Sequence, residues 1–166
     1  QYIDVIGPGA LRRSYSLANA PAPDNQLHLQ LHIRAVEGGA MTDYWFNHAK
    51  VNDLVRINGP LGSFFMRPLA GLHLIFLATG TGIAPVKAML EQLASAPATK
   101  QPLSVTVYWG GREQQDLYAK PNHWYAEVRY VPVISRATDG WTGIRGYVQK
   151  ALISDFPDLS RTVVYA

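Results

Sequence analysis

The feature that most constrains the fold is a stretch in which a nearly continuous apolar run meets a glycine-rich turn and then apolar residues at helical spacing. Residues 72–78 read LHLIFLA, a pattern typical of a strand that is covered on both faces. The glycines of TGTGIAP (79–85) come next. Apolar residues then recur at helical spacing, at Val86, Met89, Leu90 and Leu93. This order predicts a buried strand, a tight turn and an α-helix.

The same alternation continues to the end of the sequence. Residues 103–111 and 128–135 read as two further buried strands, residues 146–156 as a helix and residues 162–166 as a fourth strand. Strands that alternate with helices at this spacing predict a Rossmann-like parallel α/β sheet.

The first 68 residues predict β-structure of another kind. Residues 26–36 (QLHLQLHIRAV) alternate strictly, and the face that we expect to be buried carries Leu27, Leu29, Leu31 and Ile33. Residues 1–6 and 53–59 read as further strands, and Gly/Pro turns separate these segments. Short strands between such turns predict an antiparallel barrel or sandwich.

The change of pattern near residue 70 predicts two domains, a β domain over residues 1–70 and an α/β domain over residues 71–166. The sequence begins without methionine, directly on the strand-like QYIDVI, and ends on the strand-like TVVYA. We therefore expect both domains to be partial, the barrel truncated at its N-terminal side and the α/β sheet at its C-terminal side.

Composition excludes several classes of function. The 166 residues contain no cysteine, which excludes a disulfide framework, a thiolate metal site and a cysteine nucleophile. The net charge is +3, but the basic residues are scattered, so we expect no nucleic-acid partner. No apolar stretch reaches the roughly 20 residues of a membrane helix, so we expect no membrane span. His28 and His32 lie too far apart on one strand face to chelate an ion, and we expect no metal site.

Three predicted strand ends carry groups that suit an anionic ligand. The glycines after residue 78 let the backbone approach a ligand, and the helix that follows offers free N–H groups. Their spacing matches neither the dinucleotide fingerprint nor the Walker loop, so an ordinary strand–helix turn is an equal alternative. The next two strand ends carry Gly110, Gly111 and Arg112, and Ser135 and Arg136. Together the three ends predict a nucleotide-sized anion lying across the sheet.

The strand-like LRRSYS near the N-terminus offers a second candidate site. In a regular strand Arg13 and Tyr15 share one face, and Ser14 and Ser16 share the other. An arginine beside a tyrosine suits a ligand that has both a phosphate and a flat ring. Taken alone, the same residues favour an ordinary exposed strand.

Several motifs in one order resemble the ferredoxin–NADP reductase superfamily. RSYS is similar to its flavin motif, GGAMT to its pyrophosphate turn, GPLGSF to its barrel-closing turn and ATGTGIAP to its nicotinamide-nucleotide loop. YWGGR, ISR and WTGIRGYV follow in the expected order, so the resemblance covers almost the whole chain. Within the superfamily the sequence most resembles the iron–sulfur flavoprotein reductases, which include oxygenase reductases and CDP-6-deoxy-glucoseen reductases.

The resemblance implies an antiparallel FAD-binding β-barrel followed by a Rossmann-like parallel α/β NAD(P)-binding domain. Within the flavin motif, which includes Ser14, it implies that Arg13 neutralises the FAD pyrophosphate, that Tyr15 stacks on the isoalloxazine ring and that Ser16 hydrogen-bonds near its N5. It further implies that the FAD phosphates lie beside His32, Ile33 and Arg34, and that they are held by backbone N–H groups of Gly39, Met41 and Thr42.

For the pyridine nucleotide, the resemblance implies a site at the three strand ends. The nicotinamide end of NAD(P)H would contact Thr79, Gly80, Thr81, Gly82 and Pro85. The rest of the dinucleotide would contact Gly110, Arg112, Ser135 and Arg136. NADH is favoured because WTGIRG resembles NADH-using oxygenase reductases, although Arg136 and Arg145 leave a site for the 2′-phosphate of NADPH open.

The implied activity is hydride transfer from NAD(P)H to FAD, followed by single-electron transfer to an iron–sulfur protein or another redox partner. Tyr15, Ser16 and Thr81 would act by positioning the two rings. A 2Fe–2S cluster, which needs four cysteines, would lie in a domain outside these residues, and we expect a cytoplasmic location. Two alternatives stay open: an NAD(P)H:free-flavin reductase and a non-catalytic module that senses nucleotides.

Overall fold

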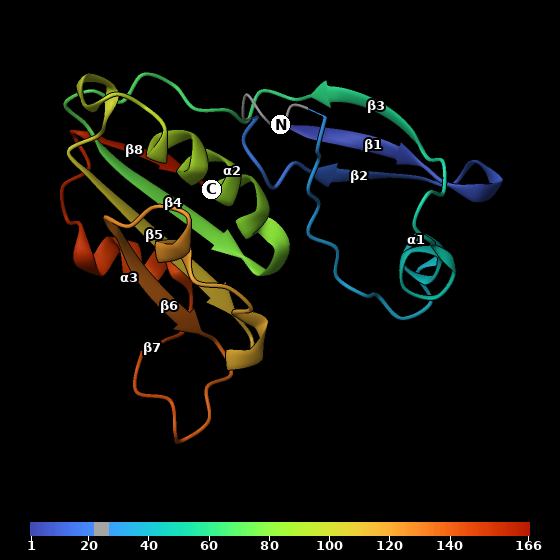
Figure 1. Cartoon of the computed structure of the whole chain (residues 1–166). Helices are drawn as coiled ribbons and strands as arrows, with labels where there is room; N and C mark the ends of the chain where they lie inside the picture. Colours follow the sequence, from blue (N-terminus) through green and yellow to red (C-terminus); the bar gives the residue numbers. More distant parts are fainter. Residues whose placement is uncertain (22–26) are drawn as a thin grey trace.

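The computed structural model describes residues 1–21 and 27–166, which form two β-rich parts side by side (Figure 1). The first part contains a three-stranded antiparallel sheet of order β2-β1-β3. Its strands are β1 (Tyr2–Ile6), β2 (Arg12–Ser16) and β3 (Arg56–Leu61). A helix, α1 (Ala40–Asp43), continues as one stretch of π-helix over Tyr44–His48 and packs on this sheet.

The second part contains a five-stranded sheet of order β7-β6-β5-β4-β8, in which every pairing is parallel. The strands are β4 (His73–Thr79), β5 (Ser104–Gly111), β6 (Val128–Ile134), β7 (Ile144–Arg145) and β8 (Thr162–Tyr165). The helices are α2 (Ile83–Ala94) and α3 (Val148–Asp155). Single 3-10 turns lie at Pro8–Ala10, Gly80–Gly82, Ala98–Lys100, Gln114–Asp116 and Pro121–His123.

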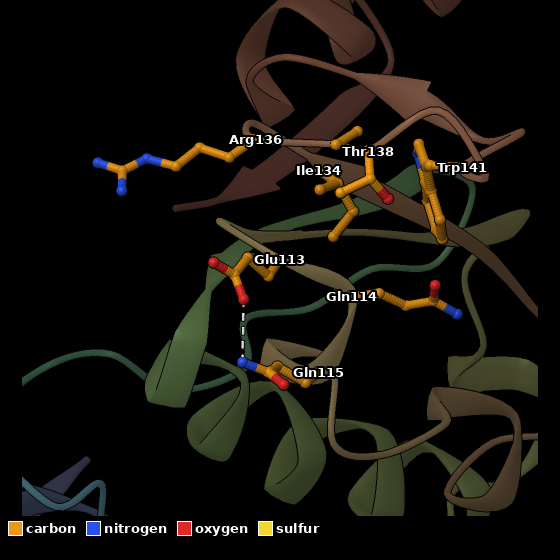
Figure 2. Close-up of a pocket in the computed structure, with 8 residues that line it drawn as sticks. Glu113, Gln114, Gln115, Ile134, Arg136, Thr138 and Trp141 are labelled. Carbon is orange, nitrogen blue, oxygen red and sulfur yellow. Dashed lines mark hydrogen bonds between the residues drawn. The ribbon is translucent and has the colours of Figure 1, made fainter.

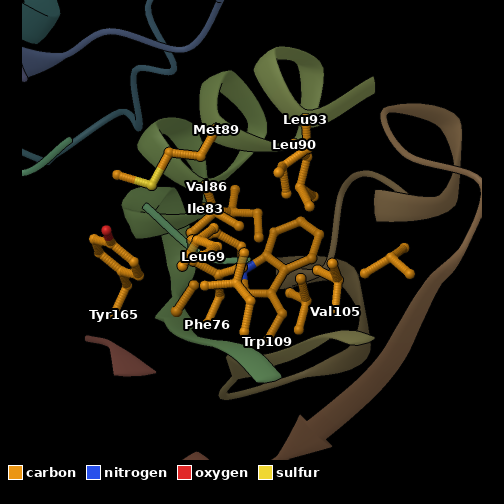
Figure 3. Packing of buried hydrophobic residues seen from close by; sticks show 14 residues of the cluster. Leu69, Phe76, Ile83, Val86, Met89, Leu90, Leu93, Val105, Trp109 and Tyr165 are labelled. Carbon is orange, nitrogen blue, oxygen red and sulfur yellow. The ribbon is translucent and has the colours of Figure 1, made fainter. Parts of the chain in front are cut away.

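The parallel sheet is covered on both faces, which explains the nearly continuous apolar run of β4. Alternate residues of a strand point to opposite faces, so Phe76 packs in the cluster beneath α2 while Ile75 packs in the cluster beneath α3. Figure 3 shows the α2 side, where Trp109 and Phe76 lie against the apolar side of the helix. Removing a side chain of this size from water stabilises a fold by about 1.5–3 kcal/mol. The predicted strands and helices of this part are confirmed.

A buried hydroxyl joins β5 to the end of α3. Tyr108 is fully buried, and its hydroxyl donates a 2.7 Å hydrogen bond to the carboxylate of Asp155, which also accepts a 2.6 Å bond from Arg129. Burial, above all, raises the pKa of Tyr108, and the hydrogen bond from Tyr108 is the first cause that lowers the pKa of Asp155. The phenol therefore stays protonated and the carboxylate charged.

The first part departs from the sequence prediction in one segment. Gln26 lies outside the described residues, and residues 27–36 form no strand beyond an isolated antiparallel bridge between Leu17 and Leu31. Leu27 is 98% exposed and Leu29 is 49% exposed, so the predicted burial of this face is wrong for both. Alternation produces a strand only where a neighbour completes the hydrogen-bond ladder, and that ladder is limited here to a single bridge.

Two smaller differences concern the borders of elements. The strand predicted at residues 53–59 begins later, at Arg56, and continues to Leu61. The helix that begins at Ala40 was not predicted. Within the described residues, no helix has the length and apolar character to cross a membrane, and no cluster of three His, Cys, Asp or Glu residues could hold a metal ion.

Candidate functional site

A crevice of about 340 Å³ lies where the two parts meet, and both parts line it. The first part contributes His32, Ile33 and Arg34, and the second contributes Gly80, Thr81, Gln115, Asp116 and Tyr118. Nδ1 of His32 lies 2.8 Å from the hydroxyl of Tyr118, and a guanidinium nitrogen of Arg34 lies 3.8 Å from the Asp116 carboxylate. These two contacts fix the width of the crevice.

A second pocket of about 400 Å³ continues from this crevice across the ends of the parallel strands. The two share Arg34, Gly80, Thr81 and Asp116. The second pocket adds Thr79, Gly110, Gly111, Arg112, Ser135, Gly146, Tyr147, Val148 and Gln149. The structure therefore brings together most of the residues that the sequence assigned to a dinucleotide, at the carboxyl ends of β4, β5 and β6.

Glycine at position 80 keeps the centre of this cleft open. Gly80 has φ 48°, a conformation that other residues rarely adopt, and no described atom lies within 4 Å of the point where a Cβ would stand. The indole N–H of Trp109 donates a 3.0 Å hydrogen bond to the carbonyl of Gly80. A buried side chain of the core thus holds the loop in a shape that exposes its backbone to the cleft.

Asp116 is a capping residue that organises the loop after β5. Its carboxylate accepts hydrogen bonds from the backbone N–H groups of Arg112 (2.8 Å) and Glu113 (3.1 Å), and these bonds, that of Glu113 first, lower its pKa. Because the carboxylate is charged, it also attracts Arg34 from the first part.

A third pocket, of about 580 Å³, lies at the start of α1 and is lined by residues that include Gly38, Gly39, Thr42 and Phe46. A Cβ on Gly39 would stand 2.6 Å from Oγ1 of Thr42, whose hydroxyl lies within hydrogen-bond distance of the carbonyls of Gly39 and Val36. The turn therefore requires glycine. The side chain of Met41 is buried in the core, so Met41 can contribute to this pocket only through its backbone.

The RSYS segment lies in β2. Ser14 donates a 2.6 Å hydrogen bond to the buried Asp4 on one face of the sheet. On the other face the Tyr15 hydroxyl accepts a 3.2 Å bond from the indole of Trp45, whose ring lies edge-on at 6.5 Å. The predicted alternation of side chains is confirmed. Arg13, Tyr15 and Ser16 lie outside the pockets described above, and the hydroxyl of Ser14 is already engaged by Asp4.

Comparison with known families identifies both parts. A family described as the oxidoreductase NAD-binding domain matches residues 76–166, and one described as the oxidoreductase FAD-binding domain matches residues 1–66. The chain belongs to the family of oxidoreductases that carry an FAD-binding and an NAD-binding domain. The two parts are accordingly called the FAD-binding part and the NAD-binding part below.

Curated relatives match the chain over all or most of its length. The chain is 43% identical over its full length to the CDP-6-deoxy-L-threo-D-glycero-4-hexulose-3-dehydrase reductase of Yersinia pestis, of which it covers 50%. It is 33% identical to the reductase component DmpP of the phenol 2-monooxygenase of Pseudomonas sp. strain CF600, with 94% of this chain and 45% of the relative covered. The chain thus spans about half the length of the curated relatives it matches.

Solved structures confirm the fold class. The cytochrome P450 reductase GcoB of Amycolatopsis superposes with a TM-score of 0.80 at 32% identity, over 99% of this chain and 50% of that one. The ferredoxin reductase of carbazole 1,9a-dioxygenase superposes with a TM-score of 0.83 at 21% identity, over the same shares, and this similarity shows the fold alone. The resemblance to the ferredoxin–NADP reductase superfamily is confirmed.

A further pocket of the NAD-binding part, of about 620 Å³, lies farther along the strand ends and is lined by Glu113, Gln114, Gln115, Ile134, Arg136, Ala137, Thr138 and Trp141. Figure 2 shows the side chain of Arg136 extending away from Trp141, with Glu113 hydrogen-bonded to Gln115 at 2.9 Å. Arg145, which the sequence offered as a partner for a phosphate, instead donates hydrogen bonds to the carbonyls of Ala137, Thr138 and Trp141.

Gly82 and Pro85 lie in the first turn region of α2, outside the lining of the two pockets around Gly80. Conversely, sequence reasoning missed Tyr118 and Gln115 as cleft residues. They follow β5 in the segment EQQDLY, whose only local signal is the capping acid Asp116. The contact of Tyr118 with His32, and the place of Gln115 in the same crevice, depend on how the two parts pack, which no local pattern reports.

Proposed function

We propose that the chain is the flavin- and nucleotide-binding portion of an NAD(P)H-dependent reductase that passes electrons to an iron–sulfur protein. One observation carries the proposal: a single crevice is lined by His32–Arg34 of the FAD-binding part and by Gly80 and Thr81 of the NAD-binding part. Two redox rings can exchange a hydride only if both are held in one such space. Relatives with this domain pair carry names of dehydrase and oxygenase reductases.

The FAD-binding part offers the hydrogen-bond donors and cations that a flavin dinucleotide needs. The pocket at Gly39 lies where the backbone N–H groups of the first turn of α1 have no partner within the helix, which suits a pyrophosphate. Arg13 and Arg34 would supply cations, and Tyr15 a flat ring. The bound FAD would accept a hydride from the reduced nicotinamide and release its electrons one at a time.

The residues of this chain would act by placement. Thr81 lies in the crevice on the loop that precedes α2, and Ser16 ends the strand that carries Tyr15. In this proposal they orient the nicotinamide and the flavin, and Tyr118 with His32 closes the crevice against water. Arg112 and Ser135 bind the remainder of the dinucleotide along the strand ends.

NADH is the proposed electron donor. Glu113 lines the same pocket as Arg136, so a 2′-phosphate placed there would meet a carboxylate as well as a guanidinium. Arg145 is committed to three backbone carbonyls. A ribose diol, by contrast, can donate hydrogen bonds to Glu113 without repulsion.

The proposal includes a division of the chain near residue 70, with an FAD-binding domain over residues 1–70 and an NAD(P)-binding domain over residues 71–166. The iron–sulfur acceptor lies outside these residues, which contain no cysteine. We place the reaction in the cytoplasm, because NADH is regenerated there.

A second candidate is a free-flavin reductase, in which the flavin is a substrate and leaves after reduction. One relative favours it: the chain is 28% identical to an NAD(P)H-flavin reductase of Aliivibrio fischeri, over 99% of this chain and 72% of the relative. Arg13 lies exposed on β2, which agrees with loose binding of the flavin.

One experiment separates the candidates. The full chain is saturated with FAD, passed through a desalting column and mixed with NADH under anaerobic conditions. The proposal predicts that flavin stays bound and that its visible absorbance is bleached by one equivalent of NADH. Loss of flavin on the column, with NADH consumption only when flavin is added back, supports the free-flavin reductase. Bound flavin that NADH does not bleach contradicts both and leaves the nucleotide-sensing module.

A further inference from the structure

The two parts are also joined by an ion pair on α2. Lys87 and Glu91 lie one helical turn apart and form a salt bridge on the side of α2 that faces the FAD-binding part. The side chain of Lys87 is only 11% exposed, and that of Glu91 is 32% exposed. Helix pairs of this spacing are usually exposed and contribute little, so a pair whose lysine is largely covered calls for a specific reason.

The pair binds backbone atoms of the FAD-binding part. The ammonium of Lys87 donates a 2.9 Å hydrogen bond to the carbonyl of Ala18, and the carboxylate of Glu91 accepts a 3.1 Å bond from the N–H of Ala20. One charged pair therefore binds a donor and an acceptor of the same short segment. Hydrogen bonds to charged groups are about twice as strong as neutral ones.

The held segment is itself tied into the FAD-binding part. The N–H of Ala18 donates a 2.8 Å bond to the carbonyl of Gln30, and the side-chain amide of Asn19 bonds to the backbone of His28 and Gln30 at 2.9 and 2.7 Å. Ala18 is completely buried. Residues 18–20 thus connect the backbone of His28 and Gln30, which precede His32, with helix α2.

We call Lys87 and Glu91, with the backbone of Ala18 and Ala20 that they bind, the clamp. The clamp lies close in sequence to both the flavin strand and the nucleotide loop that the proposed reaction uses. Ala18 follows Ser16, the end of the flavin strand, by about 6.6 Å of extended chain. Lys87 follows Gly82, the end of the nucleotide loop, by about 7.5 Å along the helix axis. The indole of Trp124, 6.0 Å from the Lys87 ammonium, helps to keep the cation in place.

We propose that Lys87 and Glu91 are positioning residues that set the distance between the flavin strand and the nicotinamide loop. This inference rests on the proposed function. Hydride transfer needs the reacting atoms about 3–3.5 Å apart, and a misplacement of about 1 Å costs about 100-fold in rate. A polar clamp at main-chain atoms fixes that distance without touching either cofactor.

The test compares Lys87→Met with Lys150→Met in the full chain loaded with FAD. Lys150 is an exposed lysine on α3, so the control removes the same charge from the same domain. At saturating NADH we expect Lys87→Met to lower the first-order rate of flavin reduction about 10- to 100-fold. The dissociation constants of FAD and NADH should change by no more than about 3-fold. Lys150→Met should match the parent chain, and Lys87→Arg should restore most of the rate because it keeps the donor and the charge.

A second readout does not depend on the cofactors. In the cofactor-free chain, Glu91→Ala should speed hydrogen exchange of the Ala20 amide at least about 10-fold, because that amide loses its acceptor. Equal reduction rates in Lys87→Met and Lys150→Met, or an unchanged Ala20 amide in Glu91→Ala, would overturn the clamp. If the parent chain itself reduces no flavin, the proposed function fails, while the exchange measurement still decides whether the clamp exists.

Discussion

Two neighbouring glycines of the nucleotide loop give a matched pair of substitutions. Gly80 has φ 48°, whereas Gly82 has φ −59° and ψ −11°, which is already helical. No described atom lies within 4 Å of an added Cβ at either position. Steric overlap is therefore equal and absent in both variants, and only the backbone conformation distinguishes Gly80→Ala from Gly82→Ala.

The expected changes in the free energy of unfolding have opposite signs. Alanine in the left-handed region costs about 1–2 kcal/mol, so Gly80→Ala should lose about 1 kcal/mol after the smaller entropy of its unfolded chain is included. Gly82→Ala should gain about 0.4–1 kcal/mol, because alanine fits a helical backbone and restricts the unfolded chain. For a chain of this size, 1 kcal/mol corresponds to a shift of about 2–4 °C in Tm.

Thermal unfolding of the cofactor-free chain, followed by circular dichroism, measures both shifts. We expect Gly80→Ala to lower Tm and Gly82→Ala to raise it, with the two variants separated by about 3–8 °C. Two variants that move Tm in the same direction, or that stay within about 1 °C of each other, would refute the loop conformation on which the open cleft depends.

Three further outcomes test other parts of the structure. Tyr108→Phe should lower the free energy of unfolding by about 1.5 kcal/mol, because the charged Asp155 loses a buried donor, and an unchanged midpoint in urea would contradict this. The hydrogen bond from Ser14, followed by that from Arg12, lowers the pKa of Asp4 below 3.8. The charged Asp4 carboxylate therefore stabilises the folded chain above that pH, and this contribution is lost as the pH falls through the lower native pKa. Asp4→Asn should accordingly flatten the loss of stability that urea titrations detect between about pH 5 and pH 2. Glu113→Gln should raise kcat/KM for NADPH relative to NADH by about 3- to 10-fold, whereas an unchanged ratio would remove Glu113 from the nucleotide pocket.

Local patterns predicted the NAD-binding part well because its elements are specified locally. The run before Gly80 is almost continuously apolar because both faces of β4 are covered, and the helical spacing from Val86 to Leu93 matches the buried side of α2. The borders agree to within a few residues. Predictions from this part also placed Thr81 and Arg112 at one edge of the sheet, where the structure has them.

The FAD-binding part was harder to predict because its strands depend on distant neighbours. Leu27 and Leu29 alternate with polar residues as a strand would, yet they lie exposed, because pairing is limited to the bridge at Leu31. The contact of Lys87 with Ala18 also could not be predicted from the sequence. The partner of Lys87 is the backbone carbonyl of Ala18, which carries no side-chain signal and lies 69 residues away.

The central claim is that one molecule of this chain holds flavin and nicotinamide in a shared crevice. The most direct measurement is a single turnover in which FAD-loaded chain is mixed anaerobically with excess NADH carrying deuterium at the transferred position. The account predicts one exponential loss of flavin absorbance, slower with deuterium than with hydrogen, at a rate that does not change with protein concentration. A rate that rises with protein concentration, or bound flavin that keeps its absorbance, would contradict it.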